Sequence, residues 1–320
     1  MSDFDPRILI LGGSGFIGRS LCEQLLRQFG GRARITVPTR RLTHAQAIQG
    51  MPGLTVLAAD VHDPQQLQAL LQGQDIVINL IAILQGSEAQ FERAHVQLPA
   101  TLAKACQATG VRRLIHVSAL GVQADAPSRY LRSKTRGEAI LKEAGLELTL
   151  LRPSVVFGAA DRFVNLFAKL QAWFPLMPLA GAAVRFQPVW VEDVAQAIVA
   201  CVQDKNTAGQ TIELAGPQVL SLGDIVRLAG QYSGHARPVL PLPAPMAWAQ
   251  ALMMELMPGE PMMSRDNLAS MRVPNVASGS LPDLESLGIT PQAMSAVLPS
   301  YLGAEQGCGR LESWRAKAGR

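Results

Sequence analysis

A tyrosine and a lysine stand four positions apart in residues 130–134 (Y-L-R-S-K). On a helix, side chains at this spacing lie on the same face. A neighbouring ammonium favours the phenolate and would lower the pKa of a tyrosine from about 10. Tyr130 could then exchange a proton with a substrate hydroxyl or carbonyl, with Lys134 as its activator. The same pair is common on solvated helix surfaces, so the surrounding elements must decide its role.

A glycine-rich turn occupies residues 12–18 (G-G-S-G-F-I-G), between an apolar run and an amphipathic stretch. It fits both G-x-G-x-x-G and G-x-x-G-x-x-G. Glycine permits the tight turn, the approach of a pyrophosphate and close helix–strand contact, and the helix N-terminus attracts phosphate. We therefore expect a dinucleotide to contact Gly12, Gly13, Ser14, Gly15, Phe16, Ile17 and Gly18.

The segment that follows predicts which dinucleotide binds. An NAD site places an acidic residue at the end of the second strand, but residues 36–41 (T-V-P-T-R-R) contain none. Arg40 lies 22 positions after Gly18, near the place of an arginine that binds a 2′-phosphate. Guanidinium groups bind phosphate bidentately. Arg40 and Arg41 therefore favour NADP(H) over NAD(H), the alternative being two solvated loop arginines.

Further cofactor contacts are expected where later strands end, because ligands of such sheets bind at the carboxyl ends of the strands. We assign Asp60 to the adenine amino group and Val61 to the adenine face. The alternative for Asp60 is an N-cap of a helix beginning at Pro64. Two further strands contribute Leu80, Ile81, Ala82 and Ser118. Lys134 could also hold the nicotinamide ribose.

Apolar β-branched runs alternate with helical patterns in the first half of the chain, which indicates a doubly wound parallel sheet of the Rossmann type. After residue 153 this regularity ends, which suggests a smaller C-terminal lobe. We divide the chain into residues 1–160, residues 161–216, which return partly to the sheet, and residues 217–320. The expected strands are 7–11, 34–39, 54–58, 75–81, 113–118, 147–151, 184–191 and 211–214. The expected helices are 16–29, 91–109, 128–144, 162–173 and 193–202.

The composition of the 320 residues excludes several classes of protein. Hydrophobic residues make up 48% and charged residues 17%, so a large core is expected and global disorder is not. The net charge of +4 and the absence of a Lys/Arg run of five or more residues argue against nucleic-acid binding. No metal-like spacing occurs. The cysteines are expected as free thiols in a cytoplasmic protein, and they are Cys22, Cys106, Cys201 and Cys308.

Residues 244–257 (A-P-M-A-W-A-Q-A-L-M-M-E-L-M) predict an unusually apolar helix. Trp248, Leu252, Met253 and Leu256 follow helical spacing, which is typical of a core face. The alternative is a surface for a protein partner or a membrane interface, because Met-rich faces adapt to varied apolar partners. The basic segment 310–320 is expected to be a frayed or solvated helix.

The sequence resembles the extended short-chain dehydrogenase/reductase superfamily in its glycine turn, Asp60-Val61, Tyr130 with Lys134, and Arg152-Pro153. It is similar in particular to an atypical branch that contains the nucleotide-binding accessory subunit of respiratory complex I and its bacterial relatives. Residues 130–132, 157–158, 161–163, 187–189, 264–266 and 283–289 carry that similarity. The resemblance implies bound NADPH, a cofactor contact at Pro153 and a C-terminal lobe near a membrane-arm surface.

Two departures from active members leave two hypotheses open. Active members carry Ser or Thr where this chain has Ala119, and a longer stretch than the 12 positions between Ser118 and Tyr130. The first hypothesis is an NADP(H)-dependent oxidoreductase or epimerase-like enzyme acting on a small-molecule or quinone-like substrate. The second is a nucleotide-binding accessory protein with a membrane-associated partner, peripheral to the inner membrane.

Overall fold

The computed structural model describes residues 5–256 and 263–303. These residues form two compact units. Unit 1 comprises residues up to 153 together with 192–214 and 278–289, and unit 2 comprises 154–191, 215–277 and the described residues after 289. The chain therefore enters unit 1 three times, whereas the sequence analysis places all of 217–320 in one lobe. Residues 278–289 return to unit 1 because Glu213 binds them: its N–H donates to the Pro282 carbonyl and its carboxylate accepts from Ser278.

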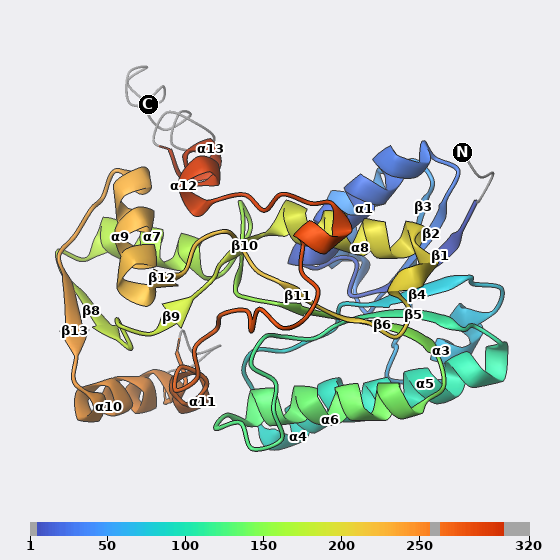
Figure 1. Cartoon of the computed structure of the whole chain (residues 1–320), viewed down its shortest axis with the longest axis horizontal. Coiled ribbons are helices and arrows are strands. Elements are labelled where there is room, and N and C mark those ends of the chain that lie inside the picture. The colour runs from blue at the N-terminus through green and yellow to red at the C-terminus, as the bar shows by residue number, and fades with distance from the viewer. Residues whose placement is uncertain (1–4, 257–262, 304–320) are drawn as a thin grey trace. The chain divides into compact units, whose positions relative to one another are not determined.

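Unit 1 is built on a parallel sheet of seven strands in the order β11-β6-β5-β4-β1-β2-β3 (Figure 1). The expected doubly wound sheet is therefore confirmed. Its central strands are buried along nearly their whole length, which is why they read as continuous apolar runs. The strands are β1 (Arg7–Leu11), β2 (Arg34–Thr39), β3 (Leu54–Ala58), β4 (Ile76–Asn79), β5 (Arg113–Val117), β6 (Glu147–Pro153) and β11 (Thr211–Leu214).

Helices cover both faces of this sheet (Figure 1). On one face, leucines of α3, α5 and α6 pack against β1, β4, β5 and β6 in a single apolar cluster. On the other face, the Gln24 side chain of α1 donates to the Glu192 carbonyl at the start of α8. The main helices are α1 (Phe16–Phe29), α3 (Pro64–Leu71), α4 (Glu88–Glu92), α5 (Leu98–Thr109), α6 (Arg129–Glu143) and α8 (Val191–Gln203). The short helical turns are Leu42–Ala45, Gln46–Gln49, Lys205–Thr207 and Glu285–Leu287.

The expected helix 91–109 is interrupted. Residues Arg93–Gln97 form a π-helical turn between α4 and α5. A π-turn inserts one residue into the helical ladder, and such turns often lie beside functional sites. This turn carries the buried side chain of His95.

Unit 2 contains three two-stranded sheets and a separate apolar core. The expected strand 184–191 is divided in two, because Pro188 has no N–H to donate between its halves. The strand pairs are β7 (Val156–Phe157) with β10 (Val189–Trp190), β9 (Arg185–Phe186) with β12 (Leu220–Ser221), and β8 (Met177–Ala180) with β13 (Val239–Leu242). The helices are α7 (Val164–Trp173), α9 (Leu222–Ser233), α10 (Ala244–Glu255), α11 (Arg265–Ser270), α12 (Met294–Val297) and α13 (Pro299–Leu302).

Helix α10 corrects one interpretation of the sequence. The side chains of Trp248 and Met253 are 52% and 64% exposed, and Leu256 just beyond the helix is 79% exposed. The buried residues of α10 are the small Ala247 and Ala251. The interpretation of Trp248, Met253 and Leu256 as core residues is therefore wrong, and these three form an exposed apolar surface of unit 2, whereas Leu252 is half-buried.

Three of the cysteines are buried and unpaired: Cys22, Cys106 and Cys201. Burial raises the pKa of the Cys22 and Cys106 thiols to about 12. Cys308 and the basic segment 310–320 lie outside the described residues. Within residues 5–256 and 263–303, every helix is too short or too polar to cross a membrane.

Candidate functional site

The glycine turn joins β1 to α1 as the motif predicts. The Gly15 N–H donates to the Gly12 carbonyl at 3.0 Å, and Gly12 adopts a φ of +84°, which favours glycine. Helix α1 begins at Phe16, with no side-chain cap from the described residues and no acid in its first turn. Its first N–H groups are therefore left for an anion.

The glycines of this turn have different roles. A Cβ atom at Gly18 would lie 2.5 Å from the Cα atom of Gly13, and one at Gly13 would lie 2.8 Å from the Val37 side chain. These two glycines permit close packing between the helix and the sheet. A Cβ atom at Gly15 would meet, within the described chain, the Gly12 carbonyl oxygen at 3.2 Å and no other atom. The exposed side of Gly15 is therefore the side that a pyrophosphate can approach.

The end of β4 lies beside this turn. The Leu80 N–H donates to the Leu11 carbonyl at 2.9 Å, and a Cβ atom at Gly12 would lie 3.3 Å from the Ile81 nitrogen. The Ile81 N–H donates to Asn79 Oδ1 at 3.1 Å, and Asn79 Nδ2 lies 3.1 Å from His116 Nδ1. The structure thus brings Leu80 and Ile81 to the glycine turn, and the expected contact of residues 80–82 with the cofactor stays a prediction. It adds Asn79, a fully buried amide that the sequence analysis missed.

The carboxyl ends of β2 and β3 carry Arg40, Arg41 and Asp60. Helix α3 is capped by Asp63, whose carboxylate accepts from the N–H groups of Gln65 and Gln66. The alternative role of Asp60 as that N-cap is therefore wrong. Asp60 Oδ1 accepts from the His62 N–H at 3.0 Å, and its Oδ2 lies 3.8 Å from Arg93 Nη2.

This region is positively charged. Arg40 and Arg41 are exposed, and neither lies within salt-bridge distance of a carboxylate in the described part of the chain. The pKa of His62 is lowered by burial and then by the charge of Arg93, while Asp60 raises it and Arg40 lowers it further. Sequence reasoning missed His62 and Arg93, because Arg93 reaches Asp60 from the distant π-turn.

Val61 lies mostly inside the protein. Its side chain is 7% exposed and packs in the cluster that contains Leu67 and Leu71. The expected contact with an adenine face is thus restricted to the small exposed part of this side chain.

Lys134 is buried beneath the end of β5. Its side chain is 2% exposed, and Nζ donates to the Val117 carbonyl at 2.9 Å. Burial lowers its pKa to about 8, and the charge of Glu138 partly opposes that effect. Burial also raises the pKa of Tyr130 to about 12. The expected lowering of the Tyr130 pKa by Lys134 is therefore wrong for this structure, because desolvation of the phenolate outweighs it.

A buried histidine connects the Tyr130 helix to the loop after β4. His95 Nδ1 lies 2.8 Å from Ser133 Oγ, which donates to the Tyr130 carbonyl at 2.7 Å. His95 Nε2 accepts from the Ile83 N–H at 3.1 Å. Nδ1 therefore carries the proton of a neutral ring, in agreement with a pKa lowered to about 3 by burial and by the charge of Lys134.

The π-turn also sets the distance between helices. The His95 ring packs edge-on against the Tyr130 ring, with centroids 5.5 Å apart. The His95 carbonyl lies against Gly137 of α6 so closely that a Cβ atom there would overlap with it. Only glycine allows this approach. Sequence reasoning missed His95, although a glycine one turn after Lys134 is a signal of close helix contact.

The residues after β5 contrast with those of active superfamily members. Ser118 is 5% exposed, and its Oγ is buried without a hydrogen-bond partner in the described chain. Ala119 is 8% exposed and packs with Val122, Ala126 and Leu131, against which Tyr130 also lies. Ala119, at the position where the resemblance implies a hydroxyl in active members, thus lies in an apolar cluster.

Strand β6 fixes helix α6 through a charged pair. The Arg152 Nε and Nη2 groups donate to the two Glu138 oxygens at 3.0 and 2.6 Å. The carbonyl of Pro153, the last residue of β6, accepts from the Leu120 N–H at 2.9 Å. Pro153 thereby holds the loop that follows Ser118 and Ala119.

Replacement of Lys134 by Met is expected to change how stability depends on pH. Because burial lowers the Lys134 pKa from 10.5 to about 8, the folded chain loses this proton before the unfolded chain does. The cost of burying the ammonium is present below about pH 8 and disappears as the pH rises to 10.5. The original chain should therefore gain up to about 3 kcal/mol relative to Lys134→Met across that range.

Urea denaturation at several pH values measures this difference. Lys104→Met, which removes an exposed lysine of α5, is the matched control and should follow the original chain. Parallel stability curves for Lys134→Met and the original chain would contradict the prediction.

Comparison with known proteins identifies this arrangement. A family described as NAD(P)H-binding matches residues 12–205. The chain belongs to this family, as an atypical short-chain dehydrogenase/reductase. This NAD(P)H-binding protein is 32% identical over 292 residues to the NADH dehydrogenase [ubiquinone] 1 alpha subcomplex subunit 9 of Mus musculus. The alignment covers 88% of the chain and 76% of that relative.

A further relative and two solved structures are also similar to this chain. The Arabidopsis thaliana subunit of the same name is 28% identical, over 92% of the chain and 76% of the relative. A nucleoside-diphosphate-sugar epimerase from Staphylococcus aureus is 16% identical, with a TM-score of 0.71 over 92% of the chain and 100% of that structure. UDP-glucuronic acid 4-epimerase from Bacillus cereus is 21% identical, with a TM-score of 0.65 over 88% and 99%. The two structures establish a common fold.

The residues of this NAD(P)H-binding protein fit a dinucleotide. Gly15 leaves open the side on which a side chain would stand, and the first turn of α1 lacks an acid. At the other end, the Ser118 hydroxyl lacks a partner within the described residues. The backbone N–H groups at the start of α1 could therefore bind the phosphates, and the Ser118 hydroxyl could form a hydrogen bond with a polar group of the cofactor.

Proposed function

We propose that this chain binds NADP(H) in preference to NAD(H) and retains it with weak or no turnover. The observation that carries the proposal is the burial of Ala119 in an apolar cluster beneath Tyr130, where active relatives place a hydroxyl. A bound nicotinamide supplies hydride chemistry. The residues of this chain can bind the dinucleotide. With Ala119 beside Tyr130, however, they offer no second hydroxyl there to donate a hydrogen bond to a substrate carbonyl.

Preference for a 2′-phosphate is supported by charge. Arg40 and Arg41 stand exposed at the end of β2, and Arg93 adds a further cation beside Asp60. Guanidinium groups match phosphate geometry. We assign Arg40 and Arg41 to the 2′-phosphate and Asp60, with Val61, to the adenine.

The remaining residues are assigned to the nicotinamide half. Tyr130 and Lys134 would hold the ribose hydroxyls, with Ser118 and Pro153 beside the nicotinamide. Residues 80–82 would pass along the pyrophosphate and ribose. With its pKa raised to about 12, Tyr130 is a neutral hydroxyl at pH 7 and donates a hydrogen bond there.

The double variant Arg40→Ala/Arg41→Ala is expected to lose most of the preference for NADPH over NADH. Removing the guanidinium partners of one phosphate should weaken NADPH binding by about tenfold or more and leave NADH nearly unchanged. Titration calorimetry with both cofactors measures the effect. Arg112→Ala, which removes an exposed arginine paired with Glu147, is the matched control. Equal affinity of the original chain for both cofactors would overturn the proposed preference.

A second candidate function is that of an accessory protein of a membrane respiratory assembly. The exposed apolar surface of α10 favours it, and so do relatives that are named as NADH dehydrogenase subunits. In this role the dinucleotide is structural and the apolar surface contacts a membrane-associated partner. The chain would then be cytoplasmic and peripheral to the inner membrane. The competing role is that of an oxidoreductase with a quinone-like substrate. Only that role requires catalytic turnover of bound NADPH, so a turnover measurement distinguishes the two.

A further inference from the structure

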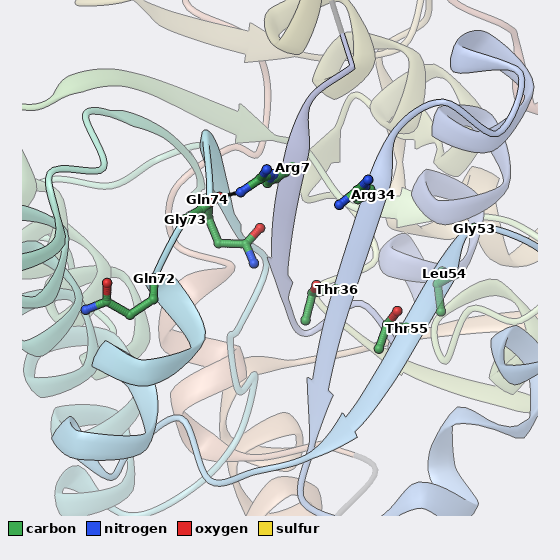
Figure 2. A pocket seen from close by; sticks show the side chains of 9 residues that line it. All are labelled: Arg7, Arg34, Thr36, Gly53, Leu54, Thr55, Gln72, Gly73 and Gln74. Carbon is green, nitrogen blue, oxygen red and sulfur yellow. Dashed lines mark hydrogen bonds between the residues drawn. The ribbon is translucent and has the colours of Figure 1, made fainter.

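An open pocket of about 480 Å³ lies at the amino-terminal ends of β1, β2 and β3 (Figure 2). The glycine turn follows the opposite end of β1. At about 3.3 Å per residue, the five residues of β1 separate the two regions by about 16 Å. The pocket is therefore distinct from the dinucleotide site, and its volume lies in the range typical of small-molecule sites.

Two arginines stand side by side in this pocket. Arg7 and Arg34 are register partners on the parallel strands β1 and β2, and both line the pocket. Like charges opposite one another on neighbouring strands destabilise a sheet. Across the residues that the structure describes, neither guanidinium lies within 4.0 Å of a carboxylate. Asp75, the acid that contacts this strand, accepts from the backbone N–H of Arg7 at 2.8 Å.

The arginine pair is partly positioned in advance. Arg7 Nη1 donates to the Gly73 carbonyl at 3.3 Å, which leaves its other N–H groups for a ligand. Figure 2 shows this contact and places Arg34 on the adjacent strand. Two forked cations at neighbouring positions suit an anion with several oxygens better than a carboxylate with two.

The rest of the pocket offers hydrogen-bonding groups that complement the two cations. Thr36 and Thr55 are register partners on β2 and β3, one rung beyond Arg34, and present hydroxyls to the pocket. Gln74 Oε1 is buried and, among the described residues, accepts no hydrogen bond. An unsatisfied buried acceptor is costly, and a ligand hydroxyl would satisfy it.

We propose that this pocket binds a hydroxylated phosphate monoester, with its phosphate between Arg7 and Arg34 and a hydroxyl donating to Gln74. The ligand is either a free metabolite of this class or the headgroup of a phosphate-monoester lipid. Binding relieves the repulsion between the arginines, so it couples the ligand to the stability of the sheet.

Titration calorimetry on the full chain with saturating NADPH tests the proposal, because the dinucleotide phosphate sites are then filled. The probes are glycerol 3-phosphate, succinate, and vesicles that contain phosphatidate. Arg34→Gln is expected to weaken binding of the phosphate probe by about tenfold or more. Arg27→Gln, which removes an exposed arginine of α1 outside the pocket, should leave binding unchanged. The same titration of Arg40→Ala/Arg41→Ala should also be unchanged, which separates this site from the proposed dinucleotide function.

Thermal unfolding gives a second readout. Without ligand, Arg34→Gln should keep or raise the melting temperature, because it removes a like-charge contact. Glycerol 3-phosphate should raise the melting temperature of the original chain and not that of Arg34→Gln. The proposal is supported if either phosphate probe binds and Arg34→Gln weakens that binding. Glycerol 3-phosphate would indicate a free metabolite, and phosphatidate vesicles would indicate a lipid headgroup. Equal binding by Arg34→Gln, a preference for succinate, or no binding of any probe overturns the proposal.

Discussion

Gly15→Val is expected to lower the affinity for NADPH by about 100-fold or more while the chain stays folded. Gly15 has an extended backbone, with φ −79° and ψ −176°, which a branched residue adopts readily. Its Cβ atom would meet the Gly12 carbonyl oxygen at 3.2 Å, an approach that a small shift relieves. The rest of the side chain would occupy the space through which the pyrophosphate approaches. Calorimetric titration measures the affinity, and circular dichroism with thermal unfolding measures the fold.

Gly18→Val is the matched comparison within the same turn. Its Cβ atom would lie 2.5 Å from both the Cα atom and the carbonyl oxygen of Gly13, which are backbone atoms. This variant should therefore lose stability whether or not cofactor is present. The contrast between the two glycines separates a ligand contact from a packing contact. If Gly15→Val binds NADPH with unchanged affinity, Gly15 does not contact the phosphates.

Bound NADPH is expected to be oxidised slowly or undetectably by nucleotide-sugars, simple carbonyls and quinones. Loss of one oxyanion donor, as at Ala119, costs about 10²–10³ in rate. Acid–base catalysis by Tyr130 would supply about 10²–10⁴ at its best. Burial raises the Tyr130 pKa to about 12, so the hydroxyl is protonated at pH 7 but is a weaker proton donor than a tyrosine of ordinary pKa. From these magnitudes we expect a slow reaction rather than an efficient one.

Single-turnover oxidation of bound NADPH, followed by its absorbance, measures this activity. Tyr130→Phe is the control, because it removes the hydroxyl and keeps the ring that packs against His95. Rapid oxidation by any compound of the panel that disappears in Tyr130→Phe would refute the proposal of a retained, weakly active cofactor. It would favour the enzyme hypothesis instead.

The fold of unit 1 was predictable where local pattern and global structure agree. The strands 7–11, 34–39 and 54–58 were placed at their observed bounds, because apolar runs flanked by glycine or helical patterns leave little choice. The glycine turn was equally predictable, because all the glycines that the turn requires lie in one short segment, residues 12–18. Local signals therefore account for the sheet and for the phosphate end of the site.

Other parts of the site depend on contacts between distant segments. Lys134 was expected to act on Tyr130, but its amine donates to the Val117 carbonyl, a partner that residue spacing does not reveal. His95 joins Ile83 to Ser133 through a π-turn, and a regular helical pattern over 91–109 concealed that turn.

Helix α10 shows a different limit of sequence reasoning. Apolar residues surround nearly the whole helix, so its pattern contains no preferred direction for burial. The spacing of Trp248, Met253 and Leu256 suggested a core face, but the buried residues of the helix are the small Ala247 and Ala251. Which side of such a helix packs is decided by the surface it meets.

The return of residues 278–289 to unit 1 has a consequence for how the chain can be divided. Strand β11 forms one edge of the seven-stranded sheet, and an uncovered edge invites pairing with other chains. Ser278 donates to the Glu213 carboxylate from its N–H at 2.6 Å and from its hydroxyl at 2.9 Å. The Pro282 carbonyl accepts from the Glu213 N–H at 2.8 Å. A chain cut after β11 would keep all seven strands of the unit 1 sheet and every residue proposed to bind the cofactor. It would nevertheless leave the buried Glu213 carboxylate without its Ser278 partners, beside an uncovered sheet edge. Residues 278–289 therefore belong to the fold of unit 1, and a chain that ends after β11 should be less stable and more prone to aggregation than one that keeps them.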